Sequence, residues 1–206
     1  MIYNLKDLYN EKTVLVTGGS GYIGSALINK LKKINCQIIR TSRTQLVSID
    51  GVEDKITDLT TKENWIEILR QADVVFHLAG NTSIAHAEKN VDDSLMSNLL
   101  PINSLINAAK ELKTYPRVVY ASTATVYGIV DIQPVVEDTI PRPESIYDLH
   151  KLYVEQYLAM ANNQGILSAK SLRLSNVYGP SLSESHSEDR GILSRITKSC
   201  MQGAII

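Results

Sequence analysis

The stretch Val14-Leu15-Val16-Thr17-Gly18-Gly19-Ser20-Gly21-Tyr22-Ile23-Gly24 decides the fold of this chain. It opens with an apolar run rich in β-branched residues, which is typical of a strand buried on both faces of a parallel sheet. Its glycines fit Gly-x-Gly-x-x-Gly from Gly19 and Gly-x-x-Gly-x-x-Gly from Gly18. Glycines leave no Cβ between the backbone and a pyrophosphate, and a following helix offers free N–H groups. The stretch therefore predicts a strand, a phosphate-binding turn and a helix.

The rest of the chain alternates between strands and helices. Strands are predicted over 37–41, 54–57, 74–78, 118–121 and 169–174. Helical spacing predicts helices over 23–35 and 146–163, one over 92–112 kinked near Pro101, and one that runs from a capping box, Thr60 to Glu63, through Leu69. A proline-containing loop spans 128–145. This order predicts an α/β fold, a doubly wound Rossmann-type parallel sheet flanked by helices.

The domain boundary is expected near residue 175. Residues 1–175 would form a dinucleotide-binding Rossmann domain, NAD(P)-binding by its glycine turn, and the pattern changes over 176–206. In that second part, 181–189 reads as a polar loop and 192–201 as the start of one more helix. We therefore expect one domain and the start of another.

Composition and charge narrow the classes of function. The 206 residues carry a net charge of −1, so nothing attracts nucleic acid or an anionic membrane over long range. No apolar stretch approaches the length of a membrane span, and the N-terminus lacks the apolar core of a signal peptide. Cys36 and Cys200 form no disulfide framework, which fits a reducing compartment. We expect a cytoplasmic protein without nucleic-acid or membrane partners.

The residues that follow the second predicted strand bear on the cofactor. An acidic residue there binds the ribose of NAD, whereas an arginine nearby accommodates the 2′-phosphate of NADP. The chain reads Arg40-Thr41-Ser42-Arg43, without an acid. We expect the cofactor to be NAD or NADP. Arg40 and Arg43 favour NADP, unless they are only solvent-exposed charges at the end of the strand.

The string Tyr147-Asp148-Leu149-His150-Lys151 carries the candidate chemistry. Tyr147 and Lys151 stand four residues apart on the predicted helix, so their side chains are neighbours. A lysine ammonium stabilises a phenolate, which makes tyrosine a usable base. Ser122 or Thr123, at the end of the fifth strand, supplies a hydroxyl on the edge of the sheet where ligands bind. The four histidines, His77, His86, His150 and His186, lack the spacing of a metal site, and no metal is expected.

Taken together, these motifs resemble the extended short-chain dehydrogenase/reductase family, in its NAD(P)-dependent nucleotide-sugar epimerase/dehydratase branch. The resemblance covers about residues 12–180. The matching strings are Thr17 to Gly24, Asp58-Leu59, His77 to Gly80, Asn98, Ser122 to Gly128, Tyr147 to Lys151, and Arg173 with Asn176 to Pro180.

The resemblance implies roles for these residues. Thr123 would take the catalytic Ser/Thr position beside Ser122, Tyr147 would be the base, and Lys151 would bind the nicotinamide ribose. Thr123 and Asn176 would face a sugar-nucleotide substrate. Asp58 and Leu59 would flank the adenine, and Asn98 would support the active-site helix. Cofactor contacts are implied for Gly18, Gly21, Tyr22, Ile23, Gly24, Arg43, Asp58, Leu59, Leu78, Ala79, Gly80, Asn98 and Lys151. The helices over 92–112 and 146–163 would form a homodimer interface, unless those faces are ordinary core.

The resemblance also bears on the reaction. Dehydratases of the family typically carry Asp-Glu after the catalytic Thr, whereas this chain has Ala124-Thr125. That difference favours a 4-epimerase or a 4-ketoreductase acting on a nucleoside-diphosphate sugar by hydride transfer. NADP would favour the reductase. Two alternatives stay open: a dinucleotide-binding fragment or module without catalysis, and an NADPH-dependent reductase of small ketones.

The chain departs from the family pattern at several positions. Ile146 stands where many relatives have proline, and Asp148 and His150 replace small residues between the tyrosine and the lysine. Members of the family are also substantially longer, because a C-terminal lobe binds their sugar nucleotide. The resemblance implies that residues 176–206 are the start of a truncated substrate-binding lobe. As a fragment or truncated product, the chain would bind cofactor without turning over substrate.

Overall fold

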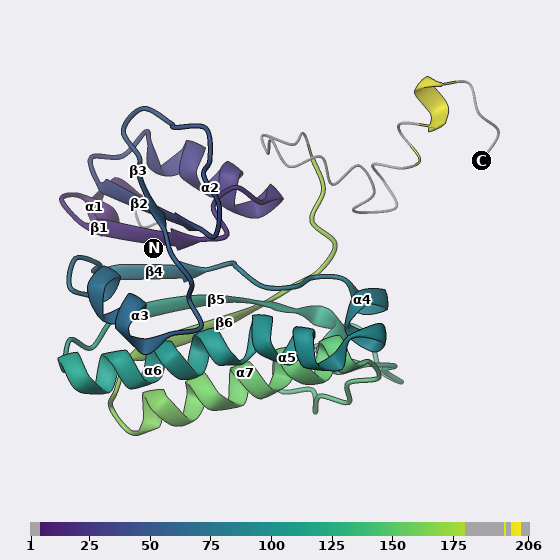
Figure 1. The fold of residues 1–206 in the computed structure, drawn as a ribbon. Coiled ribbons are helices and arrows are strands. Elements are labelled where there is room, and N and C mark those ends of the chain that lie inside the picture. Colours follow the sequence, from purple (N-terminus) through teal and green to yellow (C-terminus); the bar gives the residue numbers. More distant parts are fainter. Residues whose placement is uncertain (1–4, 180–195, 197–198, 203–206) are drawn as a thin grey trace.

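A six-stranded, wholly parallel sheet organises the computed structural model, which describes residues 5–179, 196 and 199–202. The strands lie in the order β3-β2-β1-β4-β5-β6, so the chain starts at the centre and winds outward in both directions (Figure 1). Their bounds are β1 (Thr13–Thr17), β2 (Gln37–Ser42), β3 (Glu53–Ile56), β4 (Val74–His77), β5 (Arg117–Thr123) and β6 (Ser168–Leu174). This is the doubly wound Rossmann order, which confirms the predicted fold class.

Helices cover both faces of this sheet. α2 (Tyr22–Leu31) lies on one face, and α3 (Lys62–Leu69), α6 (Leu100–Leu112) and α7 (Ile146–Asn163) lie on the other (Figure 1). The remaining helices are α1 (Leu5–Tyr9), α4 (Ile84–Lys89), α5 (Val91–Asn98) and the 3₁₀ turn η1 (Ala124–Tyr127). None of the helices in the described part of the chain has the length and apolar character needed to cross a bilayer.

The alternation of side chains along β1 separates the core into two parts. Val14 and Val16 pack with Ile28 and other apolar residues of α2. Leu15 points to the opposite face, where it joins a larger cluster that includes the fully buried Trp65. Since successive side chains of a strand face opposite sides, three consecutive apolar residues fill both cores at once.

Two helix boundaries differ from the sequence prediction. The predicted capping box at Thr60 does not form. α3 begins at Lys62, and the side chain of its N-cap, Thr61, makes no capping hydrogen bond. Asp58 accepts the Thr60 backbone N–H at 2.9 Å instead, and this turn moves the helix start along the chain. The helix expected to reach Asn35 ends at Leu31, because the next N–H groups, of Lys33 and Ile34, donate to carbonyls only three residues back and tighten the last turn.

The helix predicted over 92–112 is two helices. α5 ends at Asn98, and Pro101 lies in the first turn of α6, where its missing N–H costs no hydrogen bond. Sequence analysis missed the short elements α1, α4 and η1. The loop over 128–145 and the helix over 146–163 agree with the prediction. Most of 176–206, including the predicted loop over 181–189, lies outside the described residues.

Candidate active site

The turn between β1 and α2 is shaped by its glycines. Gly18 has a φ of +66°, and a Cβ there would lie 2.8 Å from the Ala79 nitrogen. A Cβ on Gly24 would collide with the carbonyl oxygen of Gly18. Gly21, the N-cap of α2, contributes no side-chain cap, so first-turn N–H groups remain for a ligand. The turn therefore leaves space and donors for an anionic group.

Thr17 ties this turn to the end of β4. Its buried hydroxyl accepts hydrogen bonds from the backbone N–H groups of Leu78 and Ala79, both at 3.1 Å. It also lies 3.0 Å from Nδ1 of His77. Burial, and secondarily the charge of Lys151, lower the pKa of His77 to about 3, so this imidazole is neutral and accepts the Thr17 hydrogen. Sequence analysis did not single out Thr17, although it directly follows the apolar run of β1.

The two arginines expected near a 2′-phosphate lie in different environments. Arg40 is buried and forms a bidentate ion pair with Asp54, with Nε–Oδ1 at 2.6 Å and Nη2–Oδ2 at 2.8 Å. It also donates to the Val47 carbonyl at 2.9 Å. Two nitrogens of Arg40, Nε and Nη2, are therefore engaged within the protein, and its predicted contact with a 2′-phosphate stays a prediction. Arg43 is exposed and remains available.

A cavity of about 420 Å³ lies beside the ends of β2 and β3. It is lined by Arg43, Lys55, Ile56, Thr57, Asp58, Asn64, Glu67 and Ile68. Arg43 and Asp58, which come from distant segments, thus meet at one place. Leu59, expected beside them, packs its side chain in the core instead. Its predicted adenine contact stays a prediction.

Lys151 and Tyr147 lie together at the centre of the candidate site. The Lys151 ammonium is buried, donates to the carbonyl oxygen of Ala121 at 3.0 Å, and stands 5.7 Å from the centre of the Tyr147 ring. It also lies 4.8 Å from the centre of the Tyr120 ring. Burial lowers the pKa of Lys151 to about 8, against a weaker opposing effect of the Glu155 carboxylate. A cation is thus held next to the phenol.

The neighbouring hydroxyls Ser122 and Thr123 point to different surroundings. The Ser122 hydroxyl is buried and donates to Glu155, which also holds Arg173 at 2.7 Å. The Ser122 hydroxyl thus belongs to an internal hydrogen-bond network, and its predicted catalytic role stays a prediction. Thr123 is less buried, and its oxygen lies 2.8 Å from the hydroxyl oxygen of Thr125. Of the two candidates, Thr123 is the one left with capacity for a ligand.

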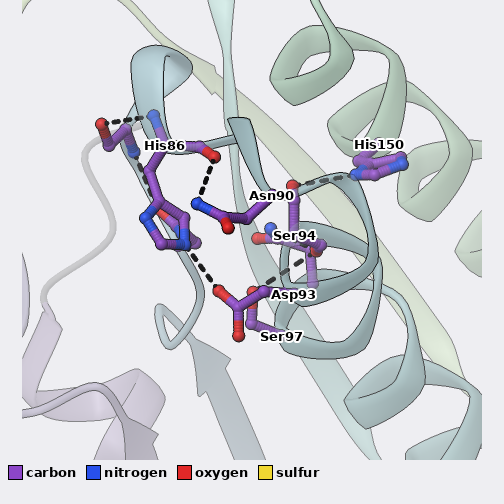
Figure 2. A network of polar contacts seen from close by, with 9 residues as sticks. His86, Asn90, Asp93, Ser94, Ser97 and His150 are labelled. Carbon is purple, nitrogen blue, oxygen red and sulfur yellow. Dashed lines mark hydrogen bonds and ion pairs between the residues drawn. The ribbon is translucent and has the colours of Figure 1, made fainter. Parts of the chain in front are cut away.

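Figure 2 shows how α5 is fixed against α7. Ser94 on α5 lies 2.9 Å from Nδ1 of His150, the residue next to Lys151. The backbone oxygen of Ser94 also accepts a hydrogen bond from the Asn98 side chain at 2.9 Å. The other end of that amide, Oδ1, is buried without a protein partner and faces Gly80. Burial lowers the pKa of His150 and so disfavours its protonated form at this contact between the two helices.

Asn176 lies in the exposed segment that follows β6. This segment returns to the glycine turn, where the Tyr22 hydroxyl donates to the Gly179 carbonyl at 2.8 Å. Its predicted contact with substrate stays a prediction. In the described part of the chain, no three side chains of His, Cys, Asp or Glu are grouped so that they could hold a metal ion.

Comparison with known proteins decides the family. The model of the NAD dependent epimerase/dehydratase family matches residues 14–206. The chain belongs to this family.

Individual members of the family show what this chain is similar to. It is 29% identical to UDP-glucuronate 4-epimerase 2 of Arabidopsis thaliana, over 83% of this chain and 43% of the relative. It is 31% identical to D-erythronate dehydrogenase of Cupriavidus necator, over 80% of this chain and 55% of the relative. The solved structure of MoeE5 in complex with UDP-glucose and NAD has a TM-score of 0.80 at 30% identity, over 93% of this chain and 62% of that one.

The length of these family members differs from that of this chain. The chain spans about half the length of the two curated relatives. Its match includes the glycine turn and the Tyr147–Lys151 pair, because the family model begins at residue 14 and extends past α7. The shared part is therefore the one that carries the candidate site.

Proposed function

We propose that this chain is an NAD(P)-dependent oxidoreductase or epimerase that acts at C4 of a nucleoside-diphosphate sugar. One observation carries the proposal: a buried lysine ammonium lies beside the ring of Tyr147, at the carboxyl end of β5. A phenol at that position is a base only if its anion is stabilised, and a cation in a dry environment does this more strongly than one in water.

The residues around the glycine turn fit a dinucleotide. Gly18 and Gly24 approach neighbouring backbone so closely that a Cβ would not fit. Thr17 accepts the N–H groups of Leu78 and Ala79 and so holds this backbone segment beside the turn. The buried Oδ1 of Asn98 lies beside Gly80, where a Cβ would come within 2.6 Å of it. A pyrophosphate on the first turn of α2 would accept N–H hydrogen bonds there. We propose that these groups hold the cofactor.

Each catalytic side chain has one task in the proposed mechanism. A nicotinamide dinucleotide, when bound, would supply the hydride chemistry at the sugar carbon. Tyr147 takes the hydroxyl proton as the carbonyl forms and gives it back when the carbonyl is reduced. Lys151 lowers the energy of the phenolate, and Thr123 hydrogen-bonds the reacting oxygen. Dehydration would need carboxylates after the catalytic threonine, and Ala124 and Thr125 offer none.

Tyr147→Phe tests the proposal. The matched control is Tyr157→Phe on the same helix, which also removes one hydrogen-bonded hydroxyl, that to Asn103 at 2.8 Å. We expect Tyr147→Phe to lower turnover of UDP-sugars by at least ~10²-fold, the usual contribution of a general base. Dinucleotide binding, followed by calorimetry, should be unchanged in both variants. Full activity in Tyr147→Phe would refute the proposal.

A second candidate function rests on one relative. D-erythronate dehydrogenase of Cupriavidus necator covers 80% of this chain at 31% identity. A dehydrogenase for a small hydroxy acid or ketone would use the same three residues. Oxidation of such an acid without any affinity for UDP-sugars would favour this candidate. Dinucleotide binding with neither substrate would indicate a cofactor-binding module.

Cofactor choice is proposed to depend on Arg43. Arg40 is paired with Asp54, so Arg43 is the remaining arginine near the cavity at the ends of β2 and β3. An arginine at this place suits a 2′-phosphate, which supports the use of NADP beside the NAD bound by MoeE5. Arg43→Ala should weaken NADPH binding about tenfold or more, as expected for a charge-assisted hydrogen bond, and leave NADH binding unchanged. Equal losses for both would contradict this role.

A homodimer is proposed on the exposed face of α5 and α7. Four large apolar side chains on these helices are 43–48% exposed: Leu95, Met96, Tyr153 and Met160. Burying such a face against a second copy would remove it from water. Sedimentation at increasing concentration tests this proposal, and Leu95→Lys should shift the equilibrium toward monomers.

A further inference from the structure

The aromatic ring of Tyr120 meets the buried ammonium of Lys151 and is not used by the mechanism proposed above. The Lys151 nitrogen lies over this ring, 4.8 Å from its centre, which is closer than the 5.7 Å to the centre of the Tyr147 ring. Both Tyr120 and Lys151 are buried, so the contact is shielded from water. Among the described residues, the Tyr120 hydroxyl has no hydrogen-bond partner. The part of Tyr120 that acts on the cation is therefore the face of its ring.

The fold fixes the position of this ring. Tyr120 lies in β5 and packs in the larger apolar cluster on the side of the sheet that carries α7. Its partner in the register of β4 is His77, whose imidazole stacks with it at 21°, with 6.1 Å between the ring centres. The next residue of β5, Ala121, supplies the carbonyl that accepts the Lys151 N–H at 3.0 Å. The strand thus presents a carbonyl oxygen and an aromatic face to the same ammonium.

The other titratable groups around Lys151 come from β4, from β6 and from its own helix. His77 of β4 is neutral, because its pKa lies at about 3. Glu155 of α7 attracts the ammonium, but the Arg173 guanidinium of β6 holds this carboxylate at 2.7 Å and shares its charge. Tyr147 of α7 contributes a phenol, which carries no charge until it acts as the base. None of these four groups gives the ammonium an anion that it does not share.

We propose that the ring of Tyr120 is a positioning group that keeps the Lys151 ammonium charged and in place beside Tyr147. The face of an aromatic ring carries partial negative charge and attracts a cation, most strongly where water is excluded. This attraction opposes the desolvation that burial imposes on the ammonium. A neutral lysine would not stabilise the Tyr147 phenolate, so the use of this charge rests on the proposed function, whereas the attraction itself does not.

Fluorinated phenylalanines in place of Tyr120 test this attraction with little change in the shape of the side chain. Each added fluorine withdraws electrons from the face of the ring and weakens its attraction for a cation. Tyr120→Phe is the reference, and mono-, di- and trifluorinated phenylalanine complete the series. The full chains also carry Tyr147→Phe, so that no phenol beside Lys151 titrates. The chemical shift of the lysine ε-carbon reports the Lys151 pKa in the cofactor-free protein.

Trifluorination should lower the proton affinity of Lys151 about tenfold relative to Tyr120→Phe, with the less fluorinated rings in between. This titration is separated from that of exposed lysines, because burial already lowers the pKa of Lys151 to about 8. The matched control is the same series at Phe76 of β4, whose ring packs in the other cluster, with α2. It should leave the Lys151 pKa unchanged. A constant pKa across the Tyr120 series, or an equal fall in the Phe76 series, would overturn the inference.

A second measurement separates this inference from the proposed function. With the Tyr147 hydroxyl retained, the alkaline limb of the pH profile of kcat for a UDP-sugar should move to lower pH with each fluorine added at Tyr120, because Lys151 loses its proton earlier. A limb that stays in place while the Lys151 pKa falls would overturn the use of this charge in the reaction. If the wild type turns over no UDP-sugar, the proposed function fails, and the pKa series in the cofactor-free chain still decides whether the ring holds the charge.

Discussion

Lys151→Met should stabilise the cofactor-free protein while it removes the proposed function. The pKa of Lys151 falls from 10.5 to about 8 because its ammonium is buried. Each pKa unit corresponds to ~1.4 kcal/mol, so keeping this group charged costs about 3 kcal/mol at neutral pH. Methionine has a similar shape and no charge. Against this gain stands the lost hydrogen bond to the Ala121 carbonyl, worth ~1 kcal/mol, so the net stabilisation should be about 2 kcal/mol.

The sign of the pH dependence gives a second check of this prediction. At pH values between the two pKa values, the unfolded chain binds the Lys151 proton and the folded chain does not, so wild-type stability rises with pH. From neutral pH to about pH 9.5 this group should add ~2 kcal/mol to the wild type. The advantage of Lys151→Met should disappear over the same range.

Urea unfolding of both proteins across this range measures the difference and cancels the titration of all other groups. The reasoning is refuted if Lys151→Met is less stable than the wild type at neutral pH, or if the difference between them does not change with pH. A dinucleotide added in excess would mask the effect, because ligand binding to the folded state stabilises it independently. The measurement therefore uses the cofactor-free chain.

Three further substitutions test the framework of the site. Gly24→Ala should weaken dinucleotide binding at least ~10-fold in calorimetry, because its Cβ would displace the Gly18 carbonyl from the turn. Glu155→Gln should lower the free energy of unfolding by about 3 kcal/mol in urea, because it removes the carboxylate that holds Arg173 at 2.7 Å. Trp65→Ala should cost about 4 kcal/mol by the same method, because the side chain is fully buried and donates to the Leu59 carbonyl at 2.8 Å.

Glu111→Gln is a control for the carboxylate substitution. Glu111 also pairs with a cation at 2.7 Å, that of Lys62, but both side chains are well exposed to water. Its loss should cost less than ~1 kcal/mol. If Glu155→Gln and Glu111→Gln lowered the free energy of unfolding equally, burial would not be the reason for the larger effect. If Gly24→Ala bound the dinucleotide as tightly as the wild type, the proposed role of the glycine turn would be wrong.

The sequence predicted the sheet and the long helices because their signals are local. Apolar runs such as Val14–Val16 match strands buried on both faces, and the 3.6-residue period over 146–163 gave the bounds of α7 correctly. The start of α3 was predicted one residue too early, because the Asp58 side chain accepts the Thr60 N–H and forms a turn before the helix. Short elements such as α4 are too brief for periodicity to reveal.

The site was harder to predict because its partners come from distant segments. Nothing in Arg40-Thr41-Ser42-Arg43 reveals that Arg40 would pair with Asp54 across the β2–β3 register. The link from Thr125 to Asp148 likewise depends on how η1 packs against α7. Pairs within one helix, such as Tyr147 and Lys151, were predictable because their spacing alone makes them neighbours.

The central position of β1 has a consequence for synthesis on the ribosome. β1 pairs with β2 soon after both have been made, but its other neighbour is β4, and Thr17 meets His77 sixty residues further along the chain. Until that strand leaves the exit tunnel, the buried strand β1 keeps one open edge, which is the kind of edge that pairs with foreign strands. The nascent N-terminal half therefore carries an unprotected sheet edge until β4 has been made.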